Sequence, residues 1–399
     1  MKNIYLLFIT LIFTVLFNVT GCSSGGGDSA PAVQPLSYVG KTDPADITLA
    51  SAPMLLANVI YGSSTASDLI TGVQASSSSP ESGNAAIATD YIETLLNYSL
   101  DNSFGSAFSG YYIPLGLAIN KTLGCDSGYI TMQGTVDDMT GAGVVAVNYV
   151  NCVLDGTTYN GSGTMTVHYI DVYTESMSAT FYFPLLTVSS SDYSGAISGS
   201  ISIDDNYNYG YQLNETMTLN VVISNDTADK MYKFENYMIQ LSISNVYDCD
   251  SGATQALDGK VYDSINGGIT VQTINPLSIS SCISTHPESG GPLIMIGNDA
   301  KMQFTVESNK HVLLEFDLDN NGVYEIVRYV LWQEFDEYAS IDLADTDGDG
   351  MHNSWETLYM LDPGVDDAGD DADSDGYTNL QEYQGGSNPM MSSSTPLDP

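Results

Sequence analysis

The sequence feature that most constrains the fold is a long succession of short segments rich in Val, Ile, Thr and Tyr between residues 111 and 335. Apolar and polar residues alternate in many of these segments, and Gly, Asn, Asp and Ser separate them, as expected for half-buried strands joined by turns. Because no segment of helical periodicity lies between them, we expect neighbouring strands to pair as antiparallel sheet. Representative expected strands cover residues 129–136, 163–173, 179–188, 211–224, 237–247, 268–274, 301–307, 311–318 and 323–332.

This pattern predicts a mainly β protein with a large antiparallel sheet, and it fits a sandwich as well as a curved or partly closed sheet. Two regions of different composition precede the sheet. Residues 45–110 mix patches of helical periodicity, at 47–61 and 85–100, with serine-rich interruptions, which predicts an N-terminal helical region. Residues 22–44 are rich in Gly, Ser and Pro, so we expect a flexible tether there.

The N-terminus indicates export. A basic start at Lys2 is followed by an uncharged apolar run over residues 4–19, which is shorter than the roughly 20 residues that span a bilayer. The tetrapeptide Val19-Thr20-Gly21-Cys22 comes next and resembles the lipobox of bacterial lipoproteins. The resemblance implies that residues 1–21 are a signal peptide cleaved before Cys22, and that the Cys22 sulfur carries a diacylglyceryl group.

The expected location is therefore the cell envelope, with the chain held at a membrane by its lipid anchor. Ser23 follows the cysteine. In enterobacterial lipoproteins the absence of Asp at that place goes with transfer to the outer membrane, which is the location we expect if this organism sorts in the same way.

Net charge excludes one class of partner. The chain has 49 acidic and 9 basic residues, a net charge of −40. Such a chain repels the phosphates of nucleic acid, so we expect no nucleic-acid partner. Acidic residues in such number either keep the protein soluble or bind cations. Carboxylates spread along the chain indicate the first role, and carboxylates at regular spacing indicate the second.

Four further cysteines are candidates for disulfides, since an even number in an exported chain favours pairing. The sequence Cys125-Asp126-Ser127-Gly128 recurs as Cys249-Asp250-Ser251-Gly252, and each copy is followed by one later cysteine, Cys152 or Cys282. Three pairings are open, together with four buried free thiols. A duplicated unit favours the sequential pairing, Cys125 with Cys152 and Cys249 with Cys282.

Regularly spaced carboxylates mark the acidic tail, residues 336–399. Two twelve-residue segments, 345–356 and 371–382, have acids at the first, third and fifth positions, Gly at the sixth and Glu at the twelfth. Calcium prefers six to eight oxygen ligands, which this spacing supplies, while the Gly permits a sharp turn. The predicted ligands, including carbonyls at the seventh position and often water-bridged Asn at the ninth, are Asp345, Asp347, Asp349, Met351, Asn353, Glu356, Asp371, Asp373, Asp375, Tyr377, Asn379 and Glu382.

The surroundings of the two segments indicate which calcium family they resemble. A short helical patch follows each segment, at 354–360 and 380–383, but no convincing helix precedes either one. Both therefore resemble thrombospondin type 3 or dockerin-like calcium repeats more than a paired EF-hand. The resemblance implies structural calcium rather than a sensor. Once calcium fixes the Gly350 and Gly376 turns, we expect Trp355, Leu358 and Leu380 to pack as a small core. The alternative is an acidic linker that stays solvated.

A third acidic turn has only the front half of the pattern. Asp317, Asp319, Asn321 and Glu325 are its candidate ligands, but Arg328 stands where the bidentate Glu belongs. Because Asn321-Gly322 is also a strong hairpin signal, we favour a turn here over a metal site.

Lipobox, cysteine pairs, Gly-rich strands and this Asp-rich turn together resemble a group of uncharacterised bacterial lipoproteins over residues 123–332. That resemblance supports the architecture and implies no activity. The sequence contains no nucleophile elbow, HExxH motif, Gly-Lys-Ser/Thr phosphate loop or CxxCH motif. We therefore expect a non-enzymatic binding or structural module with a protein or polysaccharide ligand. The alternatives are a secreted hydrolase acting on a polymer and an envelope assembly or lipid-carrying factor.

Overall fold

The structure is a computed structural model of the chain and describes twelve stretches of it. They are residues 34–59, 117–137, 140–154, 156–171, 176–191, 194–208, 212–227, 229–246, 248–280, 286–307, 311–335 and 341–396. The lipobox with Cys22, the expected helical patch at 85–100 and Cys282 lie outside these residues. Within them, no helix is both long enough and apolar enough to cross a membrane.

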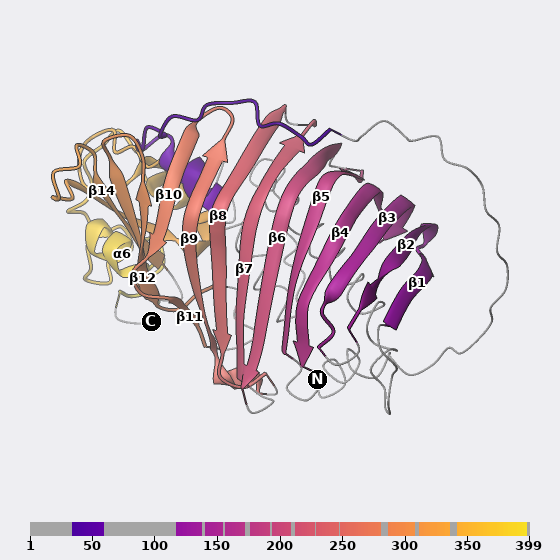
Figure 1. Cartoon of the computed structure of the whole chain (residues 1–399). Coiled ribbons are helices and arrows are strands. Elements are labelled where there is room, and N and C mark those ends of the chain that lie inside the picture. The colour runs from indigo at the N-terminus through magenta and orange to yellow at the C-terminus, as the bar shows by residue number, and fades with distance from the viewer. Residues whose placement is uncertain are drawn as a thin grey trace. The chain divides into compact units, whose positions relative to one another are not determined.

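Fifteen strands form one antiparallel sheet that is not closed (Figure 1). They follow one another in chain order, except that β11 pairs with β9 and β12 follows β10. The strands are β1 Leu117–Gly124, β2 Ser127–Val136, β3 Gly143–Leu154, β4 Thr157–Asp171, β5 Ser176–Ser189, β6 Ser194–Asn208, β7 Gln212–Asn225, β8 Lys230–Ile243, β9 Ala253–Asp263, β10 Gly267–Thr273, β11 Leu277–Ile279, β12 Gly290–Ile296, β13 Lys301–Val306, β14 His311–Asp317 and β15 Ile326–Leu331. The predicted mainly β, antiparallel fold is confirmed, and the strands form one sheet rather than a sandwich.

The chain divides into two compact units, of which the first includes residues 90–211 and 221–229. Its strands bury alternate residues, as in β3, where Val145, Val147 and Tyr149 are at most 2 % exposed while Ala146 and Asn148 between them are exposed. This period of two places one side of the strand against a core.

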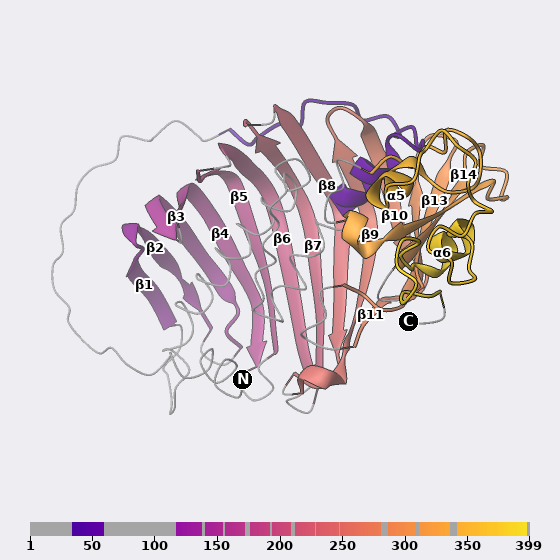
Figure 2. The same cartoon turned by 180° about the vertical axis from the view of Figure 1, so that it is seen from behind.

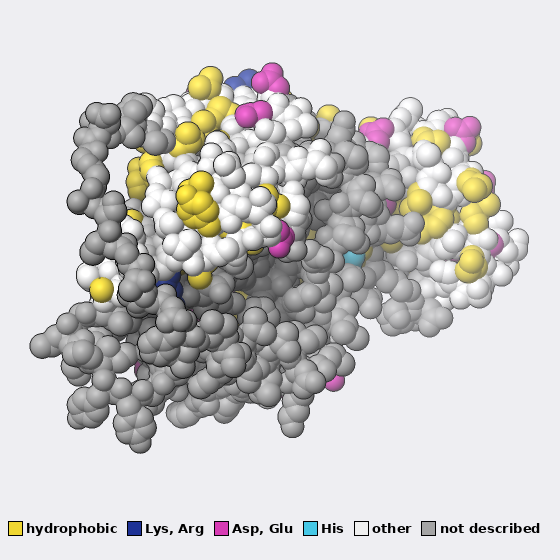
Figure 3. All heavy atoms as spheres, turned by 90° about the vertical axis from the view of Figure 1, so that its right-hand side faces the viewer, with side chains coloured by type: hydrophobic (Ala, Val, Ile, Leu, Met, Phe, Trp, Pro, Cys, Tyr) yellow, Lys and Arg dark blue, Asp and Glu magenta, His cyan; other side chains and the backbone are white. Residues whose placement is uncertain are grey.

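Acidic side chains lie at several separate places on the face of the molecule that Figure 3 presents.

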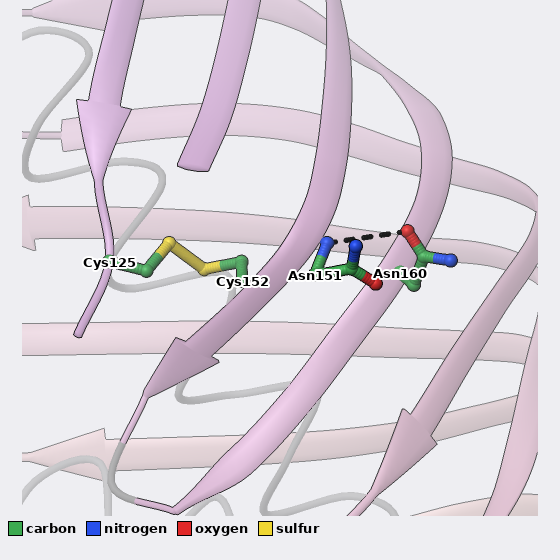
Figure 4. Close-up of a disulfide and its surroundings, with 4 residues drawn as sticks. All are labelled: Cys125, Asn151, Cys152 and Asn160. Atoms are coloured by element: carbon green, nitrogen blue, oxygen red, sulfur yellow. Dashed lines mark hydrogen bonds between the residues drawn. A yellow bond between two sulfur atoms is a disulfide. The ribbon is translucent and has the colours of Figure 1, made fainter. Parts of the chain in front are cut away.

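The predicted disulfide between Cys125 and Cys152 is present. Cys125 follows β1, Cys152 lies in β3, and their Cα atoms are 5.4 Å apart (Figure 4). Beside the bridge, the Asn151 N–H donates to Asn160 Oδ1 of β4 at 3.4 Å. The bridge therefore ties the turn between the first two strands to the third strand.

The second copy of the Cys-Asp-Ser-Gly motif begins the 3₁₀ helix η2 (Cys249–Ser251). The glycine of each copy has positive φ and lies at the start of a strand: Gly128 is the second residue of β2, and Gly252 directly precedes β9. The two copies of the motif thus share a positive φ at their glycine, a conformation that glycine adopts without steric cost. The pairing of Cys249 with Cys282 stays a prediction.

The second unit consists of residues 38–89, 212–220 and 230–399. Residues 52–59, within the expected patch at 47–61, are helical. A hydrogen bond connects this helix to the sheet: the buried Tyr237 hydroxyl of β8 donates to the Val59 carbonyl at 3.0 Å. Just before the helix, Pro44 forms a parallel bridge with Gly268 of β10.

Among the described residues, three short helices follow β15: α4 (Trp332–Phe335), α5 (Asn353–Leu358) and α6 (Asn379–Gly385). The last two start within one residue of the expected helical patches. In Figure 2, α5 and α6 lie close to the C-terminal strands. A buried cluster joins them to β15, which we call the tail core: Leu331, Met351, Trp355, Ala368 and Tyr383, with Leu380 packed against it. Trp355 and Leu380 therefore pack as expected, whereas Leu358 is 37 % exposed because it lies on the outer side of α5.

Candidate metal centre

The two predicted loops, residues 345–356 and 371–382, fold around the carboxylate at their first position. Asp345 Oδ1 accepts hydrogen bonds from the N–H groups of Gly348 (2.7 Å) and Asp349 (3.1 Å), and its Oδ2 accepts from Gly350 (3.1 Å). In the second loop, Asp371 Oδ1 and Oδ2 accept from the fifth and sixth residues at 3.1 and 2.9 Å. The sixth-position glycines have φ of 99° and 101°, so the sharp turn requires glycine there.

This folding brings three carboxylates together in each loop. Asp345, Asp347 and Asp349 each offer an oxygen, and these oxygens all lie within 4.8 Å of one another. The corresponding acids of the second loop, Asp371, Asp373 and Asp375, form an equivalent group. Two unit charges about 5 Å apart repel by roughly 3 kcal/mol at an effective dielectric constant of about 20. Each group is therefore unfavourable unless positive charge or protons offset it.

The twelfth-position glutamates are completely buried. Among the described residues, neither carboxylate oxygen of Glu356 has a hydrogen-bond partner, and Glu382 has one only on Oε1, which accepts from Ser387 Oγ at 3.2 Å. Burial, with the loop aspartates adding to it, raises the pKa of Glu356 to about 8 and that of Glu382 to about 7. A buried carboxylate without donors is costly, and either protonation or a nearby cation offsets that cost.

The same atoms lack partners in both loops. At the third and fifth positions, one oxygen of each aspartate is buried without a hydrogen bond: Oδ2 of Asp347, Asp349, Asp373 and Asp375. The other oxygen of each accepts a backbone N–H, as Asp349 Oδ1 does from Met351 at 3.0 Å. Each side chain is thus fixed by one oxygen and directs the second inward, an arrangement suited to holding a hard cation.

The loops differ at the ninth position. Asn353 uses its whole amide in the framework: Oδ1 accepts from the Thr346 N–H at 3.0 Å, and Nδ2 donates to Thr346 Oγ1 and Asp342 Oδ2. Asn379 Nδ2 donates to Asp367, but among the described residues its Oδ1 is buried without a partner.

The seventh-position residues Met351 and Tyr377 donate their N–H groups to the fifth-position aspartates.

One candidate ligand was missed at the sequence level. Asp367 lies outside both twelve-residue patterns, yet its carboxylate, with those of Asp349 and Glu356, forms a group whose oxygens lie within 4.8 Å of one another. Asp367 is one acid in the run Asp366-Asp367-Ala368-Gly369-Asp370 and has no pattern position. The sequence therefore contains no signal that would have singled it out.

Contacts with β15 fix both the first loop and α6 to the sheet. Arg328 Nε donates to the Leu343 carbonyl at 3.1 Å, and the guanidinium lies 3.5 Å from Asp345 Oδ2. The Tyr329 N–H donates to the Tyr383 hydroxyl of α6 at 3.0 Å. Buried His352 caps α5 by accepting the Trp355 N–H on Nδ1, and its Nε2 lies 3.0 Å from the Tyr329 carbonyl.

The third acidic turn connects β14 and β15, which pair as the expected hairpin. Buried Asp317 accepts from the N–H groups of Asn321 and Gly322, both at 2.9 Å. Oxygens of Asp317, Asp319 and Glu325 lie within 4.8 Å of one another, but among the described residues none of these oxygens is both buried and unpartnered. This cluster could hold an ion by distance alone.

Comparisons with protein-family models, curated proteins and solved structures give no match for the chain.

Proposed function

We propose that the C-terminal tail binds two structural calcium ions, one in each loop, and that these ions stabilise the tail core. The observation that carries the proposal is the repeated set of buried oxygens without hydrogen-bond partners at the third, fifth and twelfth positions of both loops. Two loops of different sequence lack partners at corresponding atoms. A bound cation satisfies all of these atoms at once, whereas a solvated acidic linker would leave them exposed to water.

Calcium fits these ligands better than other common cations. All of the converging side chains in the two loops offer oxygen, which suits a hard ion, and none offers the sulfur or imidazole that zinc and copper prefer. Glu356 has two unpartnered oxygens and can bind in a bidentate manner. Magnesium demands a smaller octahedral shell and keeps most of its water, so a loop with so many carboxylates suits it poorly.

The chain as a whole is proposed to be a lipid-anchored protein of the cell envelope, placed at the outer membrane by Cys22, that acts as a binding or structural module. The open sheet supports this proposal because it provides an extended scaffold, and the tail core is fixed to its last strand, β15. The proposed ligand of the sheet is a protein or polysaccharide. Tyrosine side chains, of which the chain has 27, supply amphipathic contact area for such a surface.

Equilibrium dialysis of the purified full chain against calcium tests the metal assignment. We expect two bound ions in the wild type and one in either Glu356→Gln or Glu382→Gln, because each variant removes one buried carboxylate. Asp366→Asn, which removes an exposed acid of the same tail, is the matched control and should retain two. Binding of no calcium at millimolar concentration would show that the tail is an acidic linker.

Lipidation has its own test. In cells grown with labelled palmitate, the wild-type chain should become labelled and Cys22→Ser should stay unlabelled. The reason is that the acyl chains are attached to the sulfur and the amino group of Cys22. Equal labelling of both chains would contradict the anchor, and it would leave the calcium proposal untouched.

A further inference from the structure

A carboxylate from the segment before the second loop reaches into the first loop. Asp349 and Glu356 belong to the first loop, and Asp367 lies between the loops. Oxygens of these three side chains lie within 4.8 Å of one another. This group shares Asp349 with the group formed by Asp345 and Asp347, so the two groups surround a continuous region.

The partners of Glu356 point independently to a ligand in this region. Glu356 is completely buried, and neither of its oxygens accepts a hydrogen bond from the part of the chain that the structure describes. Asp349 Oδ2 is also buried without a partner. Asp367 brings a third acid to a place where two carboxylates already lack donors, which is unfavourable unless a cation lies among them.

The ninth position of the first loop leaves a place for this extra carboxylate. Both polar atoms of the Asn353 amide already have partners within the framework, so that side chain offers the ion no unpartnered oxygen. In the second loop the equivalent oxygen, Asn379 Oδ1, is buried and unpartnered. The two loops therefore complete their ligand sets in different ways.

Asp367 is held by the second loop. Asn379 Nδ2 donates to the Asp367 carbonyl at 3.0 Å and to Asp367 Oδ1 at 3.3 Å. Asn379 is the first residue of α6, and its N–H donates to the Asp370 carbonyl at 2.8 Å. Ordering the second loop thus fixes the position and orientation of a carboxylate that faces the first loop.

We propose that Asp367 is a ligand of the ion in the first loop, an inference that rests on the proposed calcium function. The two calcium ions therefore bind with positive cooperativity. An ion in the second loop orders Asn379, which positions Asp367 for the first ion. By thermodynamic linkage, the first ion must strengthen binding of the second by the same factor.

Calorimetric titration of the full chain with calcium, in wild type, Asp367→Asn and Asp366→Asn, tests this inference. The two variants remove the same charge from adjacent residues, but Asp366 is exposed and belongs to neither metal group. We expect Asp367→Asn to weaken the first-loop ion by roughly ten- to hundredfold, because ligand charge sets the affinity of such loops. Asp366→Asn should match the wild type.

Variants in which only one loop can bind calcium identify which of the two ions Asp367→Asn weakens. With Glu382→Gln disabling the second loop, Asp367→Asn should still lower the affinity of the remaining ion. With Glu356→Gln disabling the first loop, Asp367→Asn should change the affinity of the second-loop ion far less, and that retained ion shows that the variant folds. Cooperativity should be lost in Asp367→Asn.

Three results would overturn the inference while leaving calcium binding intact. They are identical titrations of Asp367→Asn and Asp366→Asn, two independent sites in the wild type, or a third bound ion that disappears in Asp367→Asn. The last result would assign Asp367 to a separate ion. Failure of the proposed function itself has a different signature, which is that the wild type binds no calcium.

Discussion

The two acidic loops of the tail, residues 345–356 and 371–382, and the turn at residues 317–325 share the same pattern of backbone hydrogen bonds but differ in the chemistry of their carboxylates. In all three, the first-position aspartate accepts N–H groups from the fifth and sixth residues, and the fifth-position side chain accepts the seventh N–H. An Asp-rich sequence with Gly at the sixth position is therefore sufficient to form the turn. Formation of the turn does not by itself indicate that the turn binds metal.

The difference lies in the oxygens that lack partners. Both loops bury a Glu at the twelfth position and direct unpartnered aspartate oxygens inward. The third turn has Arg328 at its twelfth position, and among the described residues its acids have no oxygen that is both buried and unpartnered. Arg328 instead binds the Leu343 carbonyl and lies beside Asp345 of the first loop. The residue that departs from the metal pattern thus anchors the neighbouring loop to the sheet.

Removal of calcium should separate these regions most clearly. In chelator we expect proteases to cut between residues 343 and 389, while the hairpin of β14 and β15 resists cleavage. Calcium at about 100 times its dissociation constant stabilises a site by about 2.7 kcal/mol, which corresponds to roughly a hundredfold slower cleavage through local opening. Limited proteolysis followed by mass spectrometry measures this, and magnesium should protect far less.

Two further observations would decide the interpretation of that experiment. The double variant Asp345→Ala with Asp371→Ala should lose the protection by calcium while keeping the Cys125–Cys152 bridge. Equal resistance of the wild-type tail in chelator and in calcium would contradict the distinction between the loops and the third turn.

A second test uses pH. In metal-free protein the pKa of Glu356 is about 8 and that of Glu382 about 7, against 4.5 for an ordinary glutamate, chiefly because of burial. Above about pH 6.5 the folded tail therefore holds more protons than the unfolded tail, so its stability falls as the pH rises. Below that pH the buried His352, whose pKa is lowered to about 4, partly offsets the trend. With calcium the trend should reverse, because the ion binds the deprotonated carboxylates.

Thermal unfolding of the tail, followed by the fluorescence of Trp355, measures both trends. We expect a lower melting temperature at pH 8 than at pH 5 in chelator, and the opposite order in saturating calcium. Glu356→Gln should remove part of the dependence in chelator, and the double variant Glu356→Gln with Glu382→Gln should remove more, since the amides do not titrate. The same order of melting temperatures with and without calcium would be inconsistent with ion binding at these glutamates.

Local pattern predicted the loops well because their frame is made within twelve residues. Asp345 and Asp371 receive hydrogen bonds from residues three to five positions along the chain, so the sequence alone contains the whole turn. Asp367 could not be predicted, because it reaches the first loop only when the tail packs. Arg328 was recognised as a departure from the pattern. Its hydrogen bond to the Leu343 carbonyl could not be predicted, because the two residues are fifteen positions apart and no local pattern connects them.

The sheet shows a similar limit. Alternation predicted antiparallel strands, since a period of two is a local property of a half-buried strand. Whether the strands form one sheet or two depends on which edges pair, and alternating burial in strands such as β3 is the same in both arrangements. The predicted sequential bridge between Cys125 and Cys152 was correct because the duplicated motif marked which cysteine begins each unit.

The smallest expected effect is a matched pair of third-position substitutions. Asp347→Asn should weaken calcium binding by at least tenfold, because Asp347 Oδ2 is a buried oxygen that the ion needs. Asp319→Asn should leave the count of bound ions at two and change the unfolding free energy by less than about 0.5 kcal/mol, since Asp319 is exposed. Its Oδ1 accepts the Asn321 N–H at 3.2 Å, a bond that the amide oxygen of asparagine can keep. Calcium titration and urea unfolding of both variants measure this contrast. Loss of one bound ion in Asp319→Asn would show that the third turn is itself a calcium site, and that the buried unpartnered oxygens are not what distinguishes the loops.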